Sequence, residues 1–266
     1  MLRVNMLPSS QRQWVDEMQV LGVDIGGSGI KGAPVDLMTG RLAAHRHRIA
    51  TPHPATPDAV ADVVAAVAAA HGWSGPFGVT IPGVVHNGVV ATAANIDDGW
   101  IGLDAGRLFA ARLDVAVVVI NDADAAGLAE ATFGAGRGRG GLVVLLTFGT
   151  GIGSALIHDG TLIPNSELGH LELHGASAEH FAASQHLAEE GAEDGLTLDE
   201  WAGRVNEYLA HVERILSPDL IIFGGGISKR FEVFGGDLRS AADIVPAVLR
   251  NNAGIVGAAL AAKETR

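Results

Sequence analysis

Cysteine is missing from all 266 residues, which excludes disulfide bonds, zinc sites built from thiolates and a cysteine nucleophile. Basic residues are scarce as well, with 18 Lys and Arg against 30 Asp and Glu and a formal net charge of −12. A protein of that charge repels nucleic acids and anionic membranes, so we expect neither as a partner. Any polyanion that the chain binds must therefore meet a local basic pocket.

Long hydrophobic runs are also missing. The first 18 residues contain no continuous apolar stretch of the kind found in secretory signals. The most apolar helical run, 59–70, is interrupted by Asp62 and is too short to cross a bilayer. Hydrophobic residues nevertheless make up 48% of the chain, which is too much for a disordered protein. We expect a cytoplasmic globular protein that begins with a flexible tail at residues 1–18.

Glycine is abundant, with 36 residues, and two glycine clusters share one pattern. Apolar residues 20–25 precede the first cluster at 26–29, and apolar residues 142–147 precede the second at 148–153. A further apolar run follows each cluster, which is typical of a β-hairpin around a glycine turn. Because the clusters stand almost half a chain apart, they indicate a duplication that produced two α/β lobes around a shared cleft.

The remaining pattern alternates strands and helices. A β-branched apolar run at 115–120 predicts a central strand buried on both faces, and a third strand is predicted at 42–50. Helices are predicted at 56–71, 103–112, 122–133, 178–190, 197–216 and 254–263. The expected domains are an N-terminal α/β lobe at 19–121 and a C-terminal α/β lobe at 122–253, with the last helix, about 254–264, free to pack back on the first lobe.

The first glycine cluster lies within Asp24-Ile25-Gly26-Gly27-Ser28-Gly29-Ile30-Lys31. Glycine lets the backbone approach a phosphate closely, so that its N–H groups donate to the phosphate oxygens. Asp24, at the end of the preceding strand, is placed to hold the Mg²⁺ that accompanies such a phosphate. A plain tight hairpin explains one such motif equally well. The second copy at 147–153 favours two hairpins that clamp a phosphate chain from both sides.

Polar and glycine residues follow two of the predicted strands at their carboxyl ends, where ligands of open α/β sheets collect. Asn121 and Asp122 follow the 115–120 strand, and a carboxylate there can accept a proton from an attacking hydroxyl. Both residue types also favour the N-cap of a helix, so one of them could cap while the other acts as a base. Gly224-Gly225-Gly226 follows the strand at 220–223 and fits either a nucleotide contact or a simple turn.

A polar loop supplies groups that can grip sugar hydroxyls. Glu167 and His170 lie in the loop, and Glu179 follows. His170 and His174 also have the spacing of a metal pair on a helix, but Gly169 and the alternating pattern at 171–173 argue against a helix. We therefore expect no such metal site.

In this order, the motifs at 24–31, 121–122, 147–153, 167–170 (Glu-Leu-Gly-His) and 222–226 (Ile-Phe-Gly-Gly-Gly) resemble the ROK family (repressor, open reading frame, kinase) of sugar kinases. The resemblance runs from residue 19 to the end of the chain. It implies an α/β fold of the actin-like, hexokinase type, with two lobes of duplicated, ribonuclease H-like domains and an interlobe cleft. It also implies a homodimer.

The resemblance implies roles for individual residues as well. Asp122 is the expected base that deprotonates the 6-hydroxyl of the sugar, and Asp24 is expected to reach Mg²⁺ through water. The residues expected to hold the sugar are Gly83, Asn95, Asn121, Asp122, Glu167, His170 and Glu179. Those expected to hold phosphate are Asp24, Gly26, Gly27, Ser28, Gly29, Lys31, Thr147, Gly149, Thr150 and Gly151, with Gly224, Gly225 and Gly226 on the nucleotide side.

One difference from most family members indicates which branch of the family the chain resembles. Most bacterial members of the family carry a Cys-rich zinc motif after the Glu-x-Gly-His histidine, whereas residues 171–179 here contain no cysteine. No zinc is therefore expected, and the alignment of Glu179 stays open. The cysteine-free segment, together with residues 145–156 and 204–209, is similar to the polyphosphate glucokinase branch of actinobacteria. The resemblance thus implies inorganic polyphosphate, ATP or both as donors, and glucose or mannose as the acceptor.

A long polyanion on an acidic protein needs a basic track, and Lys31, Arg137, Arg139, Lys229 and Arg230 lie near the motifs in sequence. Glycines flank both arginines of the 136–141 segment, which leaves the guanidiniums free to reach phosphates. A solvated surface loop explains that segment equally well.

Three other functions stay open. One is a kinase that uses ATP alone on glucose or an N-acetylhexosamine. A second is a sugar-sensing repressor of the same family, for which the 18 residues before the first strand are too few to form a DNA-binding domain. The third is a non-catalytic assembly protein of the actin type, in which the loop of Glu167 and His170 would have no purpose.

Overall fold

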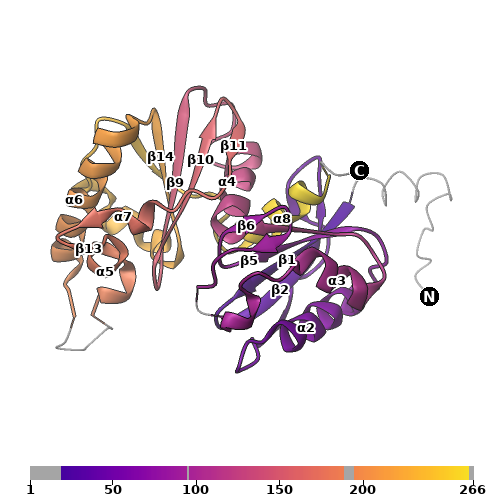
Figure 1. Cartoon of the computed structure of the whole chain (residues 1–266). Coiled ribbons are helices and arrows are strands. Elements are labelled where there is room, and N and C mark those ends of the chain that lie inside the picture. The colour runs from indigo at the N-terminus through magenta and orange to yellow at the C-terminus, as the bar shows by residue number, and fades with distance from the viewer. Residues whose placement is uncertain (1–18, 95, 189–194, 264–266) are drawn as a thin grey trace, which may run out of the picture.

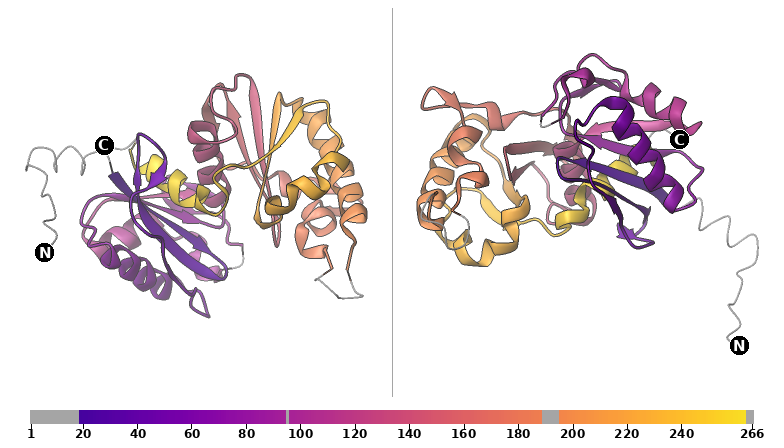
Figure 2. Two further views of the ribbon diagram at one scale, coloured as in Figure 1. Left: turned by 180° about the vertical axis from the view of Figure 1, so that it is seen from behind. Right: turned by 90° about the horizontal axis from the view of Figure 1, so that it is seen from below.

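The computed structural model describes residues 19–94, 96–188 and 195–263. These residues form two α/β bodies that meet along helices α4 (Asp122–Phe133) and α8 (Ala253–Lys263), as Figures 1 and 2 show. Among the described helices, none is long and apolar enough to cross a membrane.

The first body is built from a six-stranded sheet with helices on its outer face. Its strands are β1 (Gln19–Gly26), β2 (Gly29–Asp36), β3 (Arg41–Leu42), β4 (His47–Ile49), β5 (Phe77–Ile81) and β8 (Val117–Asn121), with a small separate pair β6 (Val85–His86) and β7 (Val89–Val90). Its helices are α2 (Pro57–Ala70), η1 (Asp98–Trp100) and α3 (Ala105–Leu113).

The strand order of this sheet is β3-β2-β1-β5-β8, and β4 also pairs with β2. β1 and β2 form the predicted antiparallel hairpin, whereas β1, β5 and β8 are parallel. The predicted central strand at 115–120 is therefore wrong in its position, because β8 lies at the edge of the sheet and is only half-buried up to Asn121. A run of β-branched residues indicates a strand but does not tell an edge from a centre when helices cover part of both faces.

The second body repeats this plan with the sheet order β11-β10-β9-β14-β15. β9 and β10 form the second antiparallel hairpin, and β14 and β15 run parallel to β9. The strands are β9 (Leu142–Phe148), β10 (Ile152–His158), β11 (Thr161–Ile163), β14 (Leu220–Gly224) and β15 (Asp243–Pro246), with a separate pair β12 (Glu172–Leu173) and β13 (Ala176–Ser177). The helices besides α4 are η2 (Leu168–His170), α5 (Glu179–Ala182), η3 (Ser184–His186), α6 (Leu198–Leu216), η4 (Gly226–Arg230), α7 (Phe231–Phe234), η5 (Gly235–Asp237) and η6 (Arg250–Asn252).

The last helix of the chain returns to the first sheet. α8 packs on β1 and β5 with one side and on α4 with another. The contact with α4 needs a glycine, since a Cβ at Gly257 would collide with the carbonyl of Ala125. Buried Ile255, Val256 and Ala259 join Val20 and Val35 of the first sheet in one apolar cluster. The two bodies are thereby connected through a tight helix pair (Figure 1).

Two predicted elements are shorter than expected. The strand predicted at 42–50 consists of β3 and β4, which pair with opposite ends of β2 and leave the residues between them outside the sheet. The helix predicted at 178–190 stops at Ala182, because Ala183 adopts an extended conformation with ψ of 150°. Alanine favours a helix, but Ala183 is extended here and ends α5.

Candidate active site

The first sheet brings Asp24 to the edge where its parallel strands end. Asp24 pairs in register with Thr80 of β5, and Ile81 of the same strand pairs with Asn121 of β8. The Thr80 hydroxyl donates to Oδ1 of Asp24 at 2.9 Å, and Nζ of Lys31 lies 3.0 Å from Oδ2. Two predicted phosphate-site residues, Asp24 and Lys31, therefore form an ion pair beside the first glycine hairpin.

The tip of the first hairpin, between β1 and β2, is open to solvent. Gly27 and Ser28 are exposed, and a side chain at Gly27 would meet nothing within 4 Å. Nη2 of Arg48 donates to the Ser28 carbonyl at 2.7 Å, so a guanidinium lies against the hairpin. Arg48 belongs to no sequence motif, and only the pairing of β4 with β2 brings it here. It is a functional candidate that the sequence did not reveal.

The second hairpin, between β9 and β10, is open in the same way. Gly149 and Thr150 are exposed, and the Gly149 amide donates to the Gly151 carbonyl at 3.0 Å. The turn at 224–226 lies directly against this hairpin, since a Cβ at Gly225 would collide with the backbone of Phe148. The structure thus brings together the second phosphate motif and the predicted nucleotide-side turn.

Asn121 and Asp122, at the start of α4, have different roles. Oδ1 of Asn121 accepts the Asp124 amide at 2.9 Å as the N-cap, and its Nδ2 donates to the Gly83 carbonyl at 3.0 Å. Asn121 is only 6% exposed and uses its amide inside the protein, where it ties Gly83 to the helix. The capping is thus done by Asn121, which leaves the Asp122 carboxylate available for chemistry.

Asp122 lies near two other carboxylates, Asp24 of β1 and Glu167 at the start of η2. Burial is the main cause that raises the pKa of Asp122 from 3.8 to about 7. The negative charges of Asp24 and Glu167 raise it as well, against the opposing effect of the Ala123 amide, which donates to Oδ1 at 2.9 Å. A carboxyl group that titrates near neutrality suits a general base, because it is ionised at physiological pH yet still binds a proton.

The predicted sugar residues of the second body converge on one imidazole. Nε2 of His170 lies 3.8 Å from Oε2 of Glu167, and Nδ1 of His170 lies 3.7 Å from Oε1 of Glu179. Burial raises the pKa of Glu167; His170 opposes that rise and Glu179 adds to it. Two carboxylates and one imidazole in this arrangement offer several acceptors and donors to a polyol.

Glu179 also contacts the second hairpin. Its Oε2 accepts the Ile152 amide at 3.3 Å, and a Cβ at Gly151 would lie 2.5 Å from that oxygen. Glu179 therefore lies between His170 and the glycine turn, although the absence of a zinc motif left its alignment open. The short helix α5, which begins at Glu179, holds it there.

A buried hydrogen-bond network holds the loop that contains Glu167 and His170, named here the sugar loop. Asp124 is 1% exposed, and its Oδ2 accepts the Asn165 amide at 2.7 Å. Burial is the main cause that raises the pKa of Asp124 to about 6. The side-chain amide of Asn165 in turn accepts from the Val85 amide and donates to the Val85 carbonyl, both at 3.0 Å. Asp124 and Asn165 thus tie the loop before Glu167 to both bodies, and neither residue is part of a recognisable motif.

The predicted basic track is only partly near these groups. Arg137 and Arg139 precede β9 at the end of that strand opposite Gly149, and Nη2 of Arg139 lies 3.2 Å from Oδ2 of Asp243. Lys229 and Arg230 are exposed on η4, directly after the turn at 224–226. Asn95 lies outside the described residues.

The residues around Asp24 fit a magnesium ion that accompanies a phosphate. Mg²⁺ prefers oxygen ligands, keeps several waters and is usually held by one or two carboxylates together with substrate phosphates. Asp24 supplies a carboxylate, 14% exposed, beside a hairpin whose open tip leaves room for a phosphate. Within the described residues, no three His, Asp or Glu side chains are grouped as ligands of a metal held by protein alone.

Known proteins resemble this chain in both sequence and structure. The family model described as "ROK family" matches residues 20–183. The chain is 55% identical over 210 residues to a polyphosphate glucokinase of Mycobacterium tuberculosis (strain ATCC 25618 / H37Rv), which covers 79% of this chain and 78% of that protein. The crystal structure of an inorganic polyphosphate/ATP-glucomannokinase from Arthrobacter sp. strain KM is 50% identical, with a TM-score of 0.88 over 93% of this chain and 99% of that chain.

A second solved structure extends the likeness to a more distant relative. A ROK family glucokinase from Streptomyces griseus, in complex with glucose and AMPPNP, is 27% identical with a TM-score of 0.77 over 92% of this chain and 99% of that chain. The mixed α/β fold with two sheets is therefore the two-lobed architecture of ROK and hexokinase-type proteins. On the extent of the family match and the identity to these relatives, the chain belongs to the ROK family.

Proposed function

We propose that this chain is a sugar kinase that transfers the terminal phosphoryl group of inorganic polyphosphate or ATP to the 6-hydroxyl of glucose, with mannose as a second acceptor. The observation that carries the proposal is the position of Asp122, whose pKa reflects the charges of Asp24 at the first hairpin and of Glu167 in the sugar loop. The named activities of relatives at 55% and 50% identity support the same donors and acceptors.

The sugar is held by the second body and the start of α4. Glu167, His170 and Glu179 bind hydroxyl groups, since both carboxylates lie within 4 Å of the His170 imidazole. Gly83 and Asn121 complete the sugar site from the first body, where the 3.0 Å bond between them keeps the loop in place. Asn95 stays a predicted sugar contact.

Asp122 accepts the proton of the 6-hydroxyl as that oxygen attacks the terminal phosphorus. The new bond joins O6 to phosphorus, and the bond from phosphorus to the bridging oxygen breaks, so that the shortened polyphosphate or ADP leaves with the electron pair. Such transfers depend mainly on positioning and charge neutralisation. The exposed glycines of the two hairpins supply N–H donors, and Lys31 supplies a positive charge.

A divalent cation belongs to kinase chemistry of this kind, and we infer Mg²⁺. The ion neutralises charge on the donor phosphates when bound, and Asp24 is the residue placed to hold it through water. No role for zinc is proposed. We also infer that the protein is cytoplasmic and forms a homodimer. The location and the dimer are both predictions from the family resemblance.

The decisive experiment is a coupled assay for glucose 6-phosphate with Mg²⁺, run separately with ATP and with purified polyphosphate. Turnover with polyphosphate is the expected result, and the same assay with mannose tests the second acceptor. Turnover with ATP alone would leave the kinase and Asp122 in place but remove the polyphosphate donor. Glucose binding without turnover from either donor would instead favour a sugar sensor.

A further inference from the structure

A row of positive charges continues from the first hairpin along the edge of the first sheet. Lys31 of β2 pairs with Arg48 of β4, and paired residues of neighbouring strands place their side chains on the same face. Arg46 lies just before β4, and its guanidinium reaches Asn251 and Asn252 ahead of α8, the helix that packs on β1 and β2. Lys31 and Arg48 lie side by side on the face that also carries Asp24, and Arg46 lies further from the hairpin tip.

Hydrogen bonds of Arg48 and Arg46 define the two ends of this row. Arg48 begins it at the hairpin, where its guanidinium donates to the Ser28 carbonyl at 2.7 Å. Arg46 lies one step further on, where its Nη1 is 3.4 Å from the carbonyl of Asn251 and 3.4 Å from Oδ1 of Asn252. The row thus runs from the phosphate hairpin to η6, the segment that leads into α8.

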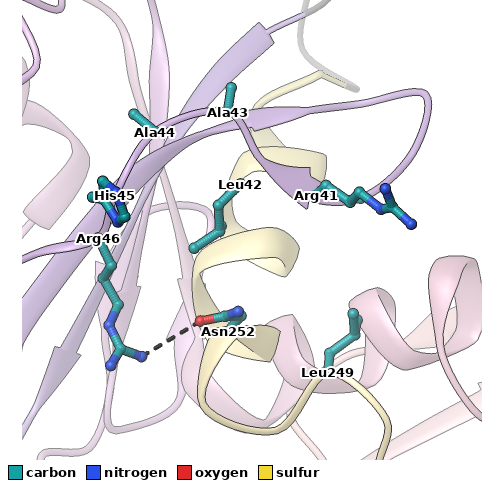
Figure 3. Close-up of a pocket in the computed structure, with 9 residues that line it drawn as sticks. Arg41, Leu42, Ala43, Ala44, His45, Arg46, Leu249 and Asn252 are labelled. Carbon is teal, nitrogen blue, oxygen red and sulfur yellow. Dashed lines mark hydrogen bonds between the residues drawn. The ribbon is translucent and has the colours of Figure 1, made fainter.

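A cavity of about 590 Å³ lies at the far end of the row (Figure 3). Arg41, His45, Arg46 and Asn252 supply its polar lining, and no acidic residue takes part in that lining. Arg41 and Arg46 flank it from opposite sides, with Leu42 between them. A hollow lined by cations and an amide, without carboxylates, has the chemistry of a site for an anion.

The arginines of this region are not neutralised by the protein itself. In residues 19–94, 96–188 and 195–263, Arg41, Arg46 and Arg48 form no salt bridge, although the chain carries a net charge of −12. All three are exposed. Asp36, the cross-strand neighbour of Arg41, accepts the Met38 amide at 2.8 Å instead. Three guanidiniums without a carboxylate partner, gathered on an acidic protein, are available to an external polyanion.

We propose that Lys31, Arg48, Arg46, His45 and Arg41, named here the β2–β4 strip, bind the distal phosphates of an inorganic polyphosphate whose terminal phosphate lies at the first hairpin. The proposal rests on the proposed kinase function and names the part of the donor that this edge recognises. From Lys31 to Asp36, the residue opposite Arg41, is five residues of β2, or about 17 Å at about 3.3 Å per residue. Because five is an odd number, the pairing places Arg41 on the other face of the sheet from Lys31, and Arg41 belongs to the strip through the lining of the cavity that it shares with Arg46. Several phosphates of an extended chain are needed to follow that length.

ATP does not need this strip, because its phosphates end at a nucleoside. The predicted nucleotide-side turn at 224–226 follows β14 in the second sheet, whereas the strip lies on β2 and β4 of the first. The loop with Arg137 and Arg139 is also separate, since β9 lies between it and the second hairpin. Variants of the strip should therefore distinguish a long donor from a short one.

The test measures the KM for long-chain polyphosphate, for tripolyphosphate and for ATP in the wild type and in Arg41→Ala/Arg46→Ala. We expect the KM for the long chain to rise about tenfold, and those for tripolyphosphate and ATP to change less than about twofold, because the short donors end at the hairpin. The dependence of the long-chain KM on salt should also become shallower, since fewer phosphates are neutralised. Arg41→Lys/Arg46→Lys keeps the charges and should stay within about threefold of the wild type.

Two controls remove arginines elsewhere. Arg137→Ala/Arg139→Ala removes two charges, as the strip variant does, from the glycine-flanked loop, and Arg107→Ala removes one charge from α3, where the arginine is 90% exposed. Neither should change the long-chain KM if the strip is the binding site. A rise with the loop variant and none with the strip variant would overturn the proposal, as would equal effects of the strip variant on ATP and on the long chain.

A parallel measurement separates failure of the strip from failure of the proposed donor. Long-chain polyphosphate is added as an inhibitor of ATP-dependent turnover. If the wild type cannot use polyphosphate as a donor, the strip still predicts inhibition that Arg41→Ala/Arg46→Ala weakens about tenfold. Inhibition of equal strength in both proteins would contradict the strip, whatever the donor preference turns out to be.

Discussion

Asp124 accepts the backbone amide of Asn165 at 2.7 Å, and this bond joins the first turn of α4 to the loop that leads into Glu167. Asn165 has a φ of 61°, a left-handed conformation that is uncommon for a residue with a side chain. Its amide group is paired in both directions with the backbone of Val85, at 3.0 Å each. The orientation of the sugar loop therefore depends on a carboxylate that is only 1% exposed.

Replacing Asp124 should weaken sugar binding more than chemistry. Asp124→Ala leaves the Asn165 amide without its acceptor, so we expect the KM for glucose to rise about tenfold and the free energy of unfolding to fall by about 1–2 kcal/mol. Asp124→Asn retains an acceptor oxygen and should restore the KM. Steady-state kinetics and thermal unfolding measure both effects. An unchanged KM beside a lower Tm would show that Asp124 only stabilises the fold.

The pH profile should report the ionisation of Asp122. Because the base must be ionised and its pKa is raised to about 7, kcat/KM for glucose should climb about tenfold per pH unit below 7 and level off above it. Asp24→Asn removes a charge that raises this pKa, so the residual activity should show the same rise at lower pH. Glu167→Gln should move it less, because its charge raises the pKa less than that of Asp24 does. A profile unmoved by either change would contradict the assigned base.

The raised pKa of Asp122 also predicts a pH-dependent stability. The folded state binds a proton at this position between the ordinary value of 3.8 and about 7, whereas the unfolded state does not, so the free energy of unfolding falls as pH rises through that window. Asp122→Asn removes the effect. The variant should be more stable than the wild type by about 1–3 kcal/mol at pH 8 and equal to it below pH about 4. Chemical denaturation across pH measures this, with the exposed Asp62→Asn as a control.

Alanine substitutions at two glycines of the second hairpin should affect the KM values of the sugar and of the donor differently. A Cβ at Gly151 would lie 2.5 Å from Oε2 of Glu179, so Gly151→Ala should displace that carboxylate and raise the KM for glucose several-fold. A Cβ at Gly149 would meet nothing within 4 Å in the protein, so Gly149→Ala should spare glucose. It should raise the KM of the donor, because the new methyl group blocks the close approach of a phosphate to the backbone. The same effect of both variants on both substrates would exclude this division.

The sequence was informative wherever function depends on local pattern. The two glycine turns, the capping role open to Asn121 or Asp122, and the order of the motifs are all visible along the chain, because each needs only neighbouring residues. The sequence did not show that β8 is an edge strand or that the helix after Glu179 ends at Ala182. Those features depend on what packs around them.

The residues that the sequence missed are brought to the site by long-range pairing. Arg48 reaches the first hairpin only because β4 pairs with β2. Asn165 connects to Val85 across a sequence separation of 80 residues. A lone arginine or asparagine in a loop has no pattern to distinguish it from a solvated residue, so only the fold could identify either.

The central claim is that Asp122 is the base of a phosphoryl transfer to the sugar, and Asp122→Asn tests it most directly. The variant and the wild type are compared for glucose 6-phosphate formation with Mg²⁺ and donor, and for glucose affinity by calorimetry. The account predicts that turnover falls by at least about 10²-fold while the Kd for glucose stays nearly unchanged, because the amide keeps the shape but cannot accept the proton. Retained turnover with a loss of glucose affinity would contradict it.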